Sequence, residues 1–71
     1  MEQKFIDKAI TENARVTIFL TNGIKLGGRI AQKDYDCLFL ERDGVLQLVY
    51  RHAIGTILPV DDFKIEIEGN V

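Results

Sequence analysis

Residues 16–28 read VTIFLTNGIKLGG and predict a β-hairpin that ends in a bend. Val16, Ile18 and Leu20 alternate with the residues between them, and this period of two is typical of a strand. Asn22-Gly23 follows, the dipeptide that most strongly favours a tight hairpin turn, and the alternation resumes directly after it. The paired glycines at positions 27 and 28 predict a sharp bend or a close approach of another backbone.

On the N-terminal side of the hairpin, residues 3–13 predict one short helix. Phe5, Ile6, Ala9 and Ile10 fall on a single apolar stripe at helical spacing, and polar residues cover much of the remainder. Asn13 is a suitable end for this helix. A helix of about three turns is marginal alone in water, so it must pack on another element.

The sequence after the bend predicts a continuation of the second strand and three further strands. Asp43-Gly44 favours a second hairpin turn, and Pro59 ends the last strand. The expected strand ranges after the bend are residues 29–32, 37–40, 45–50 and 53–58. The predicted fold class is therefore mainly β, an N-terminal helix followed by a strongly bent, five-stranded antiparallel sheet or barrel.

A chain of 71 residues allows one domain, which we place at residues 1–59. Residues 60–71 form a C-terminal extension, either a short further strand, because Phe63, Ile65 and Ile67 alternate with charged residues, or a flexible tail. A domain of this size buries only about 60% of the surface of its unfolded chain. The apolar strands at residues 45–50 and 53–58 are candidate edges that invite pairing with another copy, so we expect self-association.

The composition disfavours several classes of function. Cys37 is the only cysteine and His52 the only histidine, too few for a disulfide or a structural zinc site. Separated by many residues, they also give no set of base, nucleophile and orienting residue for an enzyme. No cofactor motif, leader or membrane-spanning run is visible, so a cytoplasmic location is expected. The net charge of −2 requires that any nucleic-acid site focus its positive charge locally.

A second stretch, residues 49–56, reads VYRHAIGT and places Arg51-His52 between two strands. Buried charge is costly, so the pair is expected at an exposed turn. Together with Asn22–Leu26 and Gly28, this stretch resembles the Hfq family, the bacterial and occasionally archaeal branch of the Sm-like proteins. The similarity runs from about residue 5 to residue 59, and it agrees with the Sm-like fold in the order of one helix and five strands.

The resemblance implies a homohexameric ring in which the fourth strand of one subunit pairs with the fifth strand of the next. The residues expected at this subunit interface are Val45, Leu48, Tyr50, Ile54 and Ile57. The resemblance also implies an RNA chaperone and post-transcriptional regulator that pairs small regulatory RNA with messenger RNA. It implies no catalytic residue, no metal and no cofactor.

On the helix-bearing, proximal face, the family binds uridine-rich RNA around a pore. Arg51 and His52 match the basic-histidine pair of the family, and Asp34 matches an aspartate that we expect to organise its loop by accepting backbone N–H bonds. Asp36 stands where the family usually has a stacking aromatic residue, and Tyr35 lies one position earlier. Because stacking contributes about 1–3 kcal/mol per base, we expect these proximal residues to bind U-rich RNA with altered or reduced affinity.

On the opposite, distal face, the resemblance implies binding of A-rich RNA. Phe19 matches a purine-stacking aromatic residue, and Gln47 matches a residue whose amide can bond a base edge. Gly27 replaces a glutamine that is frequent in the family, which puts one adenine contact in doubt. The matching distal positions are Phe19, Asn22, Gly23, Ile24, Lys25, Leu26, Gln47 and Thr56.

Two alternatives remain open. Residues 10–13 lack the arginines that many relatives carry at the end of the helix. With the acidic net charge and the missing aromatic residue, this favours a ring that serves mainly as a scaffold for proteins. The other alternative is a small β-barrel module that forms no ring, which a native mass measurement would distinguish from both ring hypotheses.

Overall fold

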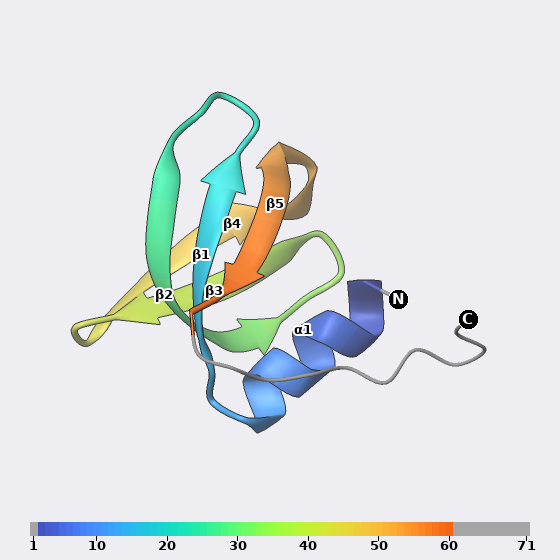
Figure 1. Ribbon diagram of the computed structural model, residues 1–71, viewed down its shortest axis with the longest axis vertical. Helices are drawn as coiled ribbons and strands as arrows, with labels where there is room; N and C mark the ends of the chain where they lie inside the picture. Colours follow the sequence, from blue (N-terminus) through green and yellow to red (C-terminus); the bar gives the residue numbers. More distant parts are fainter. Residues whose placement is uncertain (1, 61–71) are drawn as a thin grey trace.

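A computed structural model describes residues 2–60 of the chain, with side chains from Gln3 onward (Figure 1). One helix is followed by five strands, and a short 3-10 helix joins the last two strands. The bounds are α1 Glu2–Thr11, β1 Arg15–Leu20, β2 Lys25–Lys33, β3 Cys37–Arg42, β4 Val45–Tyr50, η1 Arg51–Ala53 and β5 Ile54–Pro59. The predicted strand or tail at residues 61–71 lies outside the described residues.

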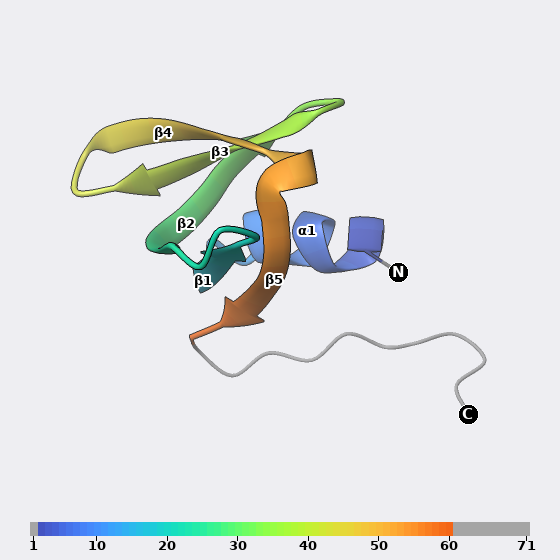
Figure 2. The same cartoon turned by 90° about the horizontal axis from the view of Figure 1, so that it is seen from above.

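The five strands form one antiparallel sheet in the order β4-β3-β2-β1-β5. The sheet is strongly bent, so that β3 and β4 cross over the layer that contains β1 and β5 (Figures 1 and 2). The two edges are β4 and β5, the strands that the sequence predicts as edges. The predicted fold, an N-terminal helix and a bent five-stranded antiparallel sheet, is confirmed.

The bend in β2 depends on a glycine without room for a side chain. A Cβ atom at Gly28 would lie 2.5 Å from the backbone oxygen of Glu41 and 3.1 Å from Cγ of Leu40. This is the close backbone approach predicted from the paired glycines. Farther along, the register between β2 and β3 shifts between Ile30 and Gln32, a bulge that bends the strand further.

Both predicted hairpins are present, with different turns. Leu20 and Ile24 pair across the first loop, where the N–H of Gly23 donates to the oxygen of Leu20 at 2.9 Å and Gly23 has a φ of 94°. This arrangement is typical of a type I turn followed by a bulge. In the second hairpin, Asp43 and Gly44 have φ values of 52° and 81°, the positive pair that a two-residue type I′ turn requires.

The helix ends at Thr11, earlier than the predicted end at Asn13. Asn13 has a φ of 53°, and its N–H donates to the oxygen of Ile10 at 3.1 Å. The N–H of Ala14 reaches back to the oxygen of Ala9 at 2.9 Å. These two bonds form the Schellman motif, in which a left-handed residue just outside the helix satisfies its last carbonyls.

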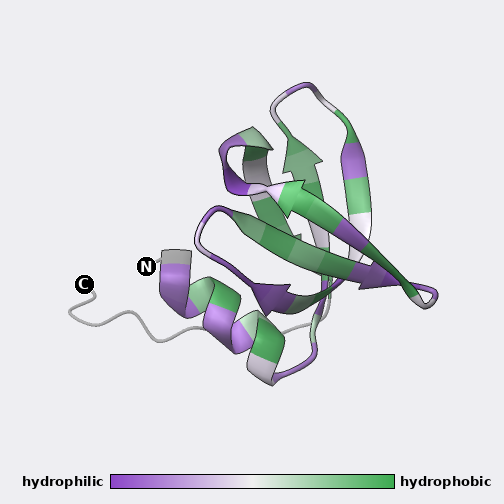
Figure 3. Ribbon diagram, turned by 180° about the vertical axis from the view of Figure 1, so that it is seen from behind, coloured by the Kyte–Doolittle hydropathy of each residue, from purple (hydrophilic) through white to green (hydrophobic). Residues whose placement is uncertain are grey.

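The core is formed by the apolar stripe of α1 and the inward side chains of the strands. In Figure 3 the apolar colours follow the strands, while polar colours mark the turns and one face of α1. The buried residues of the core are Ile6, Ala9, Ala14, Val16, Ile18, Ile30, Leu38, Leu40 and Val49. The helix is therefore held by packing, as its short length requires.

Candidate functional site

The Arg51-His52 pair lies in η1, at the corner where β4 passes into β5. The N–H of Arg51 donates to the backbone oxygen of Asp36 at 2.9 Å, and its Nη2 donates to the backbone oxygen of Asp34 at 2.9 Å. Arg51 is half-buried and His52 is exposed. The predicted polar turn is confirmed, although η1 takes up Ala53, so β5 begins one residue later than expected. Arg51 also fastens the loop between β2 and β3 to this corner.

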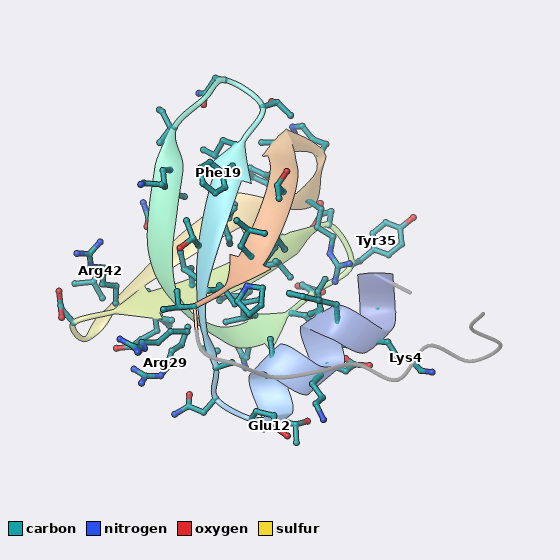
Figure 4. The ribbon with its side chains drawn as sticks, viewed as in Figure 1. Lys4, Glu12, Phe19, Arg29, Tyr35 and Arg42 are labelled. Atoms are coloured by element: carbon teal, nitrogen blue, oxygen red, sulfur yellow. The ribbon has the colours of Figure 1, made fainter. Side chains whose placement is uncertain are left out.

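That loop, residues 34–36, is organised by Asp34. Oδ1 of Asp34 accepts the N–H of Tyr35 at 2.7 Å, and the N–H of Asp34 donates to the oxygen of Cys37 at 2.9 Å. The predicted bond from the Asp34 carboxylate to a backbone N–H is present. Tyr35 is 93% exposed and projects away from the body of the molecule (Figure 4). Its ring is therefore free to meet a ligand beside the corner.

An open depression lies between this loop, the corner and the N-terminal end of α1. It has a volume of about 430 Å³ and is lined by Gln3, Lys33, Asp34, Tyr35 and Arg51. The structure thus brings three of the four predicted proximal residues together. Lys33 and Arg51 are the basic residues that line it, together with the carboxylate of Asp34, and the ammonium group of Lys33 is paired with Asp7 of α1.

His52, the fourth predicted proximal residue, has an aromatic neighbour that sequence reasoning did not assign to it. Its ring stacks on Tyr50, with the ring centroids 5.6 Å apart and the planes at 26°. Tyr50 precedes His52 by only two residues, and this short separation of two aromatic side chains was the signal in the sequence that could have predicted the contact. The corner therefore offers a stacked Tyr50–His52 pair as well as the exposed ring of Tyr35.

Cys37 is buried at the start of β3, behind the same loop. Burial raises the pKa of its thiol above the usual value of 9.0, and the carboxylates of Asp36 and Asp34 raise it further. The thiol is therefore protonated at neutral pH, which makes it a poor nucleophile and a poor metal ligand. Among residues 2–60, no group of histidine, cysteine and acidic residues is arranged to hold a metal ion.

On the other side of the sheet, Phe19 of β1 lies between residues of two neighbouring strands. The register pairs it with Lys25 of β2 on one side and with Thr56 of β5 on the other. Directly opposed residues of antiparallel strands share a face, so these three predicted distal residues form one row, the Phe19 row. It lies on the face away from Ile18, which is fully buried.

Two other predicted distal residues do not join the Phe19 row within one chain. Leu26 pairs with Ile18 and packs against the core, so it lies on the opposite side of β2 from Lys25. Gln47 is exposed on β4, and β3 and β2 stand between that strand and β1 in the sheet order. A base at Phe19 would therefore meet Gln47 only if another copy supplied it.

The remaining distal residues belong to the hairpin turn that ends the Phe19 row. Asn22 accepts the N–H of Ile24 on its Oδ1 at 3.0 Å, and Gly23 supplies the positive φ described above. These contacts shape the turn and hold Ile24, which is 52% exposed, at its tip. Ile24 thus offers an apolar surface next to Lys25.

The two edge strands carry the residues predicted for the subunit interface. On β4, Val45, Leu48 and Tyr50 are 65%, 47% and 52% exposed. On β5, Ile54 and Ile57 are half-buried against the core, yet they line a groove of about 350 Å³ between α1 and β5. Each edge strand thus carries apolar side chains that are exposed or line a groove. The described part of the chain, residues 2–60, contains no helix long and apolar enough to cross a membrane.

Comparison with known proteins matches this chain to one family. The sequence profile of the Hfq protein family matches residues 1–64. The RNA-binding protein Hfq of Bartonella bacilliformis is 44% identical over 70 residues, which cover 97% of this chain and 89% of the relative. The RNA-binding protein Hfq of Parvibaculum lavamentivorans is 41% identical over 71 residues, which cover 99% of this chain and 87% of the relative.

Two crystal structures share the fold. That of the pleiotropic translational regulator Hfq matches with a TM-score of 0.77 at 30% identity, over 80% of this chain and 95% of that chain. An Hfq protein from Anabaena sp. matches with a TM-score of 0.75 at 22% identity, over 82% of this chain and 93% of that chain. At the lower identity the likeness shows the fold alone.

Proposed function

Because this chain belongs to the Hfq family, we propose that it binds single-stranded RNA, with A-rich sequences on the face that carries the Phe19 row. The observation that carries the proposal is the row itself, in which an aromatic ring stands between an ammonium group and a hydroxyl group. The ring can stack on a base, Lys25 can meet a phosphate and Thr56 can bond a base or sugar. The relatives named above are RNA-binding proteins by name.

The proposal includes assembly into a homohexameric ring by pairing β4 of one subunit with β5 of the next. Two exposed apolar edges support it, because unprotected edges favour pairing with a further strand. In that arrangement β5 would lie between β1 of its own chain and β4 of the neighbour. Gln47 of the neighbour would then approach the Phe19 row. This would bring together two predicted distal residues that β2 and β3 separate within one chain.

A second RNA site is proposed at the pore, where copies of Arg51 and His52 would converge. Convergence of these copies would focus positive charge although each chain has a net charge of −2. Asp36 occupies the position of the expected aromatic residue, and the ring of Tyr35 is 93% exposed rather than held in place. U-rich RNA is therefore proposed to bind here, and more weakly than A-rich RNA on the distal face.

The biological role follows from two sites on one ring. We place small regulatory RNA and messenger RNA as the partners, and post-transcriptional regulation in the cytoplasm as the setting. The role requires no catalytic step and no cofactor, because holding two strands together is a matter of binding alone.

Titration of the protein with an A-rich and a U-rich oligonucleotide at physiological salt tests the proposal. Phe19→Ala should weaken A-rich binding by roughly 5- to 150-fold, the equivalent of about 1–3 kcal/mol of stacking, and leave U-rich binding unchanged. His52→Ala, an exposed substitution at the corner, should do the reverse and serves as the matched control. Equal affinity of the unsubstituted protein for both RNAs would contradict the proposed ranking of the faces.

The scaffold hypothesis is the second candidate, and specific residues favour it. The net charge is −2, and residues 10–13 at the end of α1 include no arginine or lysine. A ring that binds neither oligonucleotide in the titration would support a role in protein assembly. A monomer in native mass spectrometry would contradict both ring hypotheses.

A further inference from the structure

Three of the chain's four arginines line one depression that lies outside both proposed RNA sites. Arg15, Arg29 and Arg42 surround it, with Gly27 and Gly28 among its other lining residues, and its volume is about 570 Å³. In Figure 4 Arg29 and Arg42 lie on the flank of the molecule opposite the exposed ring of Tyr35. The depression is therefore separate from the Arg51 corner.

The sheet register brings two of these arginines together. Arg15 of β1 pairs directly with Arg29 of β2. Directly opposed residues share a face of the sheet, so the two guanidinium groups lie on one side, where an anion would be attracted to both.

Arg42 joins the pair because Gly27 has no side chain. Nη1 of Arg42 lies 3.9 Å from the position that a Cβ atom of Gly27 would take. A long side chain at position 27, such as the glutamine frequent in the family, would enter this space. The glycine therefore keeps the depression open beneath the guanidinium group.

The contacts made by Arg29 and Arg42 leave N–H donors for a ligand. Nε of Arg29 donates to the backbone oxygen of Asn13 at 3.0 Å, which uses one of the five N–H donors of the group. Nε of Arg42 lies 3.7 Å from Oδ2 of Asp43, and these side chains are 71% and 88% exposed, so the ion pair is weak. Among the described residues that line the depression, three arginines stand against the two acidic residues Glu41 and Asp43, so these lining side chains carry a net positive charge.

The depression continues the Phe19 row along β1 and β2. Three successive pairs of the register share the outer face, since alternate residues of a strand point the same way: Phe19–Lys25, Thr17–Gly27 and Arg15–Arg29. The four-residue step from Phe19 to Arg15 spans about 13 Å at ~3.3 Å per residue. Only the short side chain of Thr17 lies in the middle pair.

We propose that Arg15, Arg29 and Arg42 bind the phosphate backbone of an RNA strand where it leaves the Phe19 row. The guanidinium fork matches phosphate oxygens in pairs, which favours arginine over lysine at such a contact. The contact reads no sequence; it adds affinity that depends on salt and fixes the direction of the strand. The inference rests on the proposed function, because the Phe19 row places the strand.

The double variant Arg15→Gln/Arg42→Gln tests this, because it removes two exposed charges and keeps the bond of Arg29 to Asn13. Its affinity is measured over a range of salt for a short A-rich oligonucleotide that covers only the Phe19 row and for the same sequence with extensions at both ends. The extended RNA should bind to the double variant several-fold more weakly than it binds to the unsubstituted protein. Its log–log salt slope should fall by about 0.7 for each phosphate that the variant no longer neutralises. Binding of the short RNA should not change.

Two further variants serve as controls. Lys4→Gln/Lys8→Gln removes the same charge from α1, none of whose residues lines the depression, and should leave both affinities unchanged. Arg15→Lys/Arg42→Lys keeps the charge and should retain most of the salt slope. An unfolding curve like that of the unsubstituted protein shows that the glutamine variant is folded. If the glutamine variant does not fold, the affinity and salt slope of the lysine variant still test the contact.

Each other result overturns the inference. An unchanged affinity and salt slope for the extended RNA would show that the arginines hold no phosphate, and an equal loss in the Lys4/Lys8 control would reduce the effect to net charge. If the glutamine variant instead loses binding to polyglutamate alone, the depression serves an acidic protein. Failure of the proposed function would give a different result from failure of this inference. The unsubstituted protein would then bind neither the short nor the extended A-rich RNA.

Discussion

At the scale of single residues, Gly28 is the position where the fold has least tolerance. Its missing side chain lets β2 approach the backbone of Glu41, and a methyl group would lie 2.5 Å from that oxygen. Gly28→Ala should therefore lower the free energy of unfolding by about 1–3 kcal/mol, the usual cost of overpacking. Denaturant unfolding at fixed protein concentration measures it.

Gly27→Ala is the matched control for Gly28→Ala. Its nearest neighbours, Nη1 of Arg42 and the oxygen of Val16, lie 3.9 and 4.0 Å from the added atom, which is ordinary contact. The substitution should be close to neutral, since alanine also limits the freedom of the unfolded chain. If both variants lose the same stability, the bend does not depend on the approach of β2 to Glu41.

Residue identity alone predicted some of these roles and missed others. The paired glycines predicted the close approach of β2 to another backbone. Asp34 accepts a backbone N–H bond, as its residue type predicted. The stacking of His52 on Tyr50 depends on the 3-10 turn at the corner, whose geometry the sequence does not specify. Residue identity also did not show that Leu26, which is predicted for the distal face, pairs with Ile18 and packs against the core, on the other side of β2 from Lys25.

At the scale of elements, the end of α1 is set by a residue outside the helix. Asn13 adopts a φ of 53°, a left-handed conformation that costs other non-glycine residues about 1–2 kcal/mol. Asn13→Ala should therefore destabilise the protein by about 1 kcal/mol, whereas Asn13→Gly should be neutral or slightly stabilising. Thermal unfolding of the two variants at equal concentration gives the comparison. Equal melting temperatures would mean that the Schellman turn contributes nothing.

The elements themselves were predictable because local patterns encode them. Alternation, the two turn dipeptides and Pro59 located all five strands, and each observed strand boundary lies within about two residues of the expected one. β3 continues to Arg42, and Pro59 is the last residue of β5 rather than the first residue beyond it. What local patterns do not encode is which strands become neighbours. The row of Phe19 with Thr56, like the pairing of Arg15 with Arg29, arises from pairing between segments distant in the sequence.

At the scale of the whole molecule, one chain leaves two apolar edges uncovered. A domain this small buries too little surface to be robust alone, and β4 alone exposes Val45, Leu46, Leu48 and Tyr50 by 47–65%. Pairing of β4 with β5 of a neighbour would cover these side chains. It would also bring together copies of Arg51, so stability and local charge would both come from assembly.

A lysine on the β4 edge tests whether assembly and RNA binding depend on each other. Leu48→Lys places a charge where edge pairing would bury it, which opposes strand addition. Native mass spectrometry should show a shift from a hexamer of the 8.1 kDa chain toward smaller species. A-rich RNA should then bind at least tenfold more weakly, because the repeated sites of one ring no longer act together.

Ala31→Lys is the control, since it adds the same charge at an exposed position of the interior strand β2. It should keep both the mass of the assembly and the affinity for A-rich RNA. An intact hexamer in Leu48→Lys would place the subunit interface elsewhere than β4. A dissociated variant with undiminished affinity would mean that a single Phe19 row suffices for binding, and the ring would then serve stability rather than recognition.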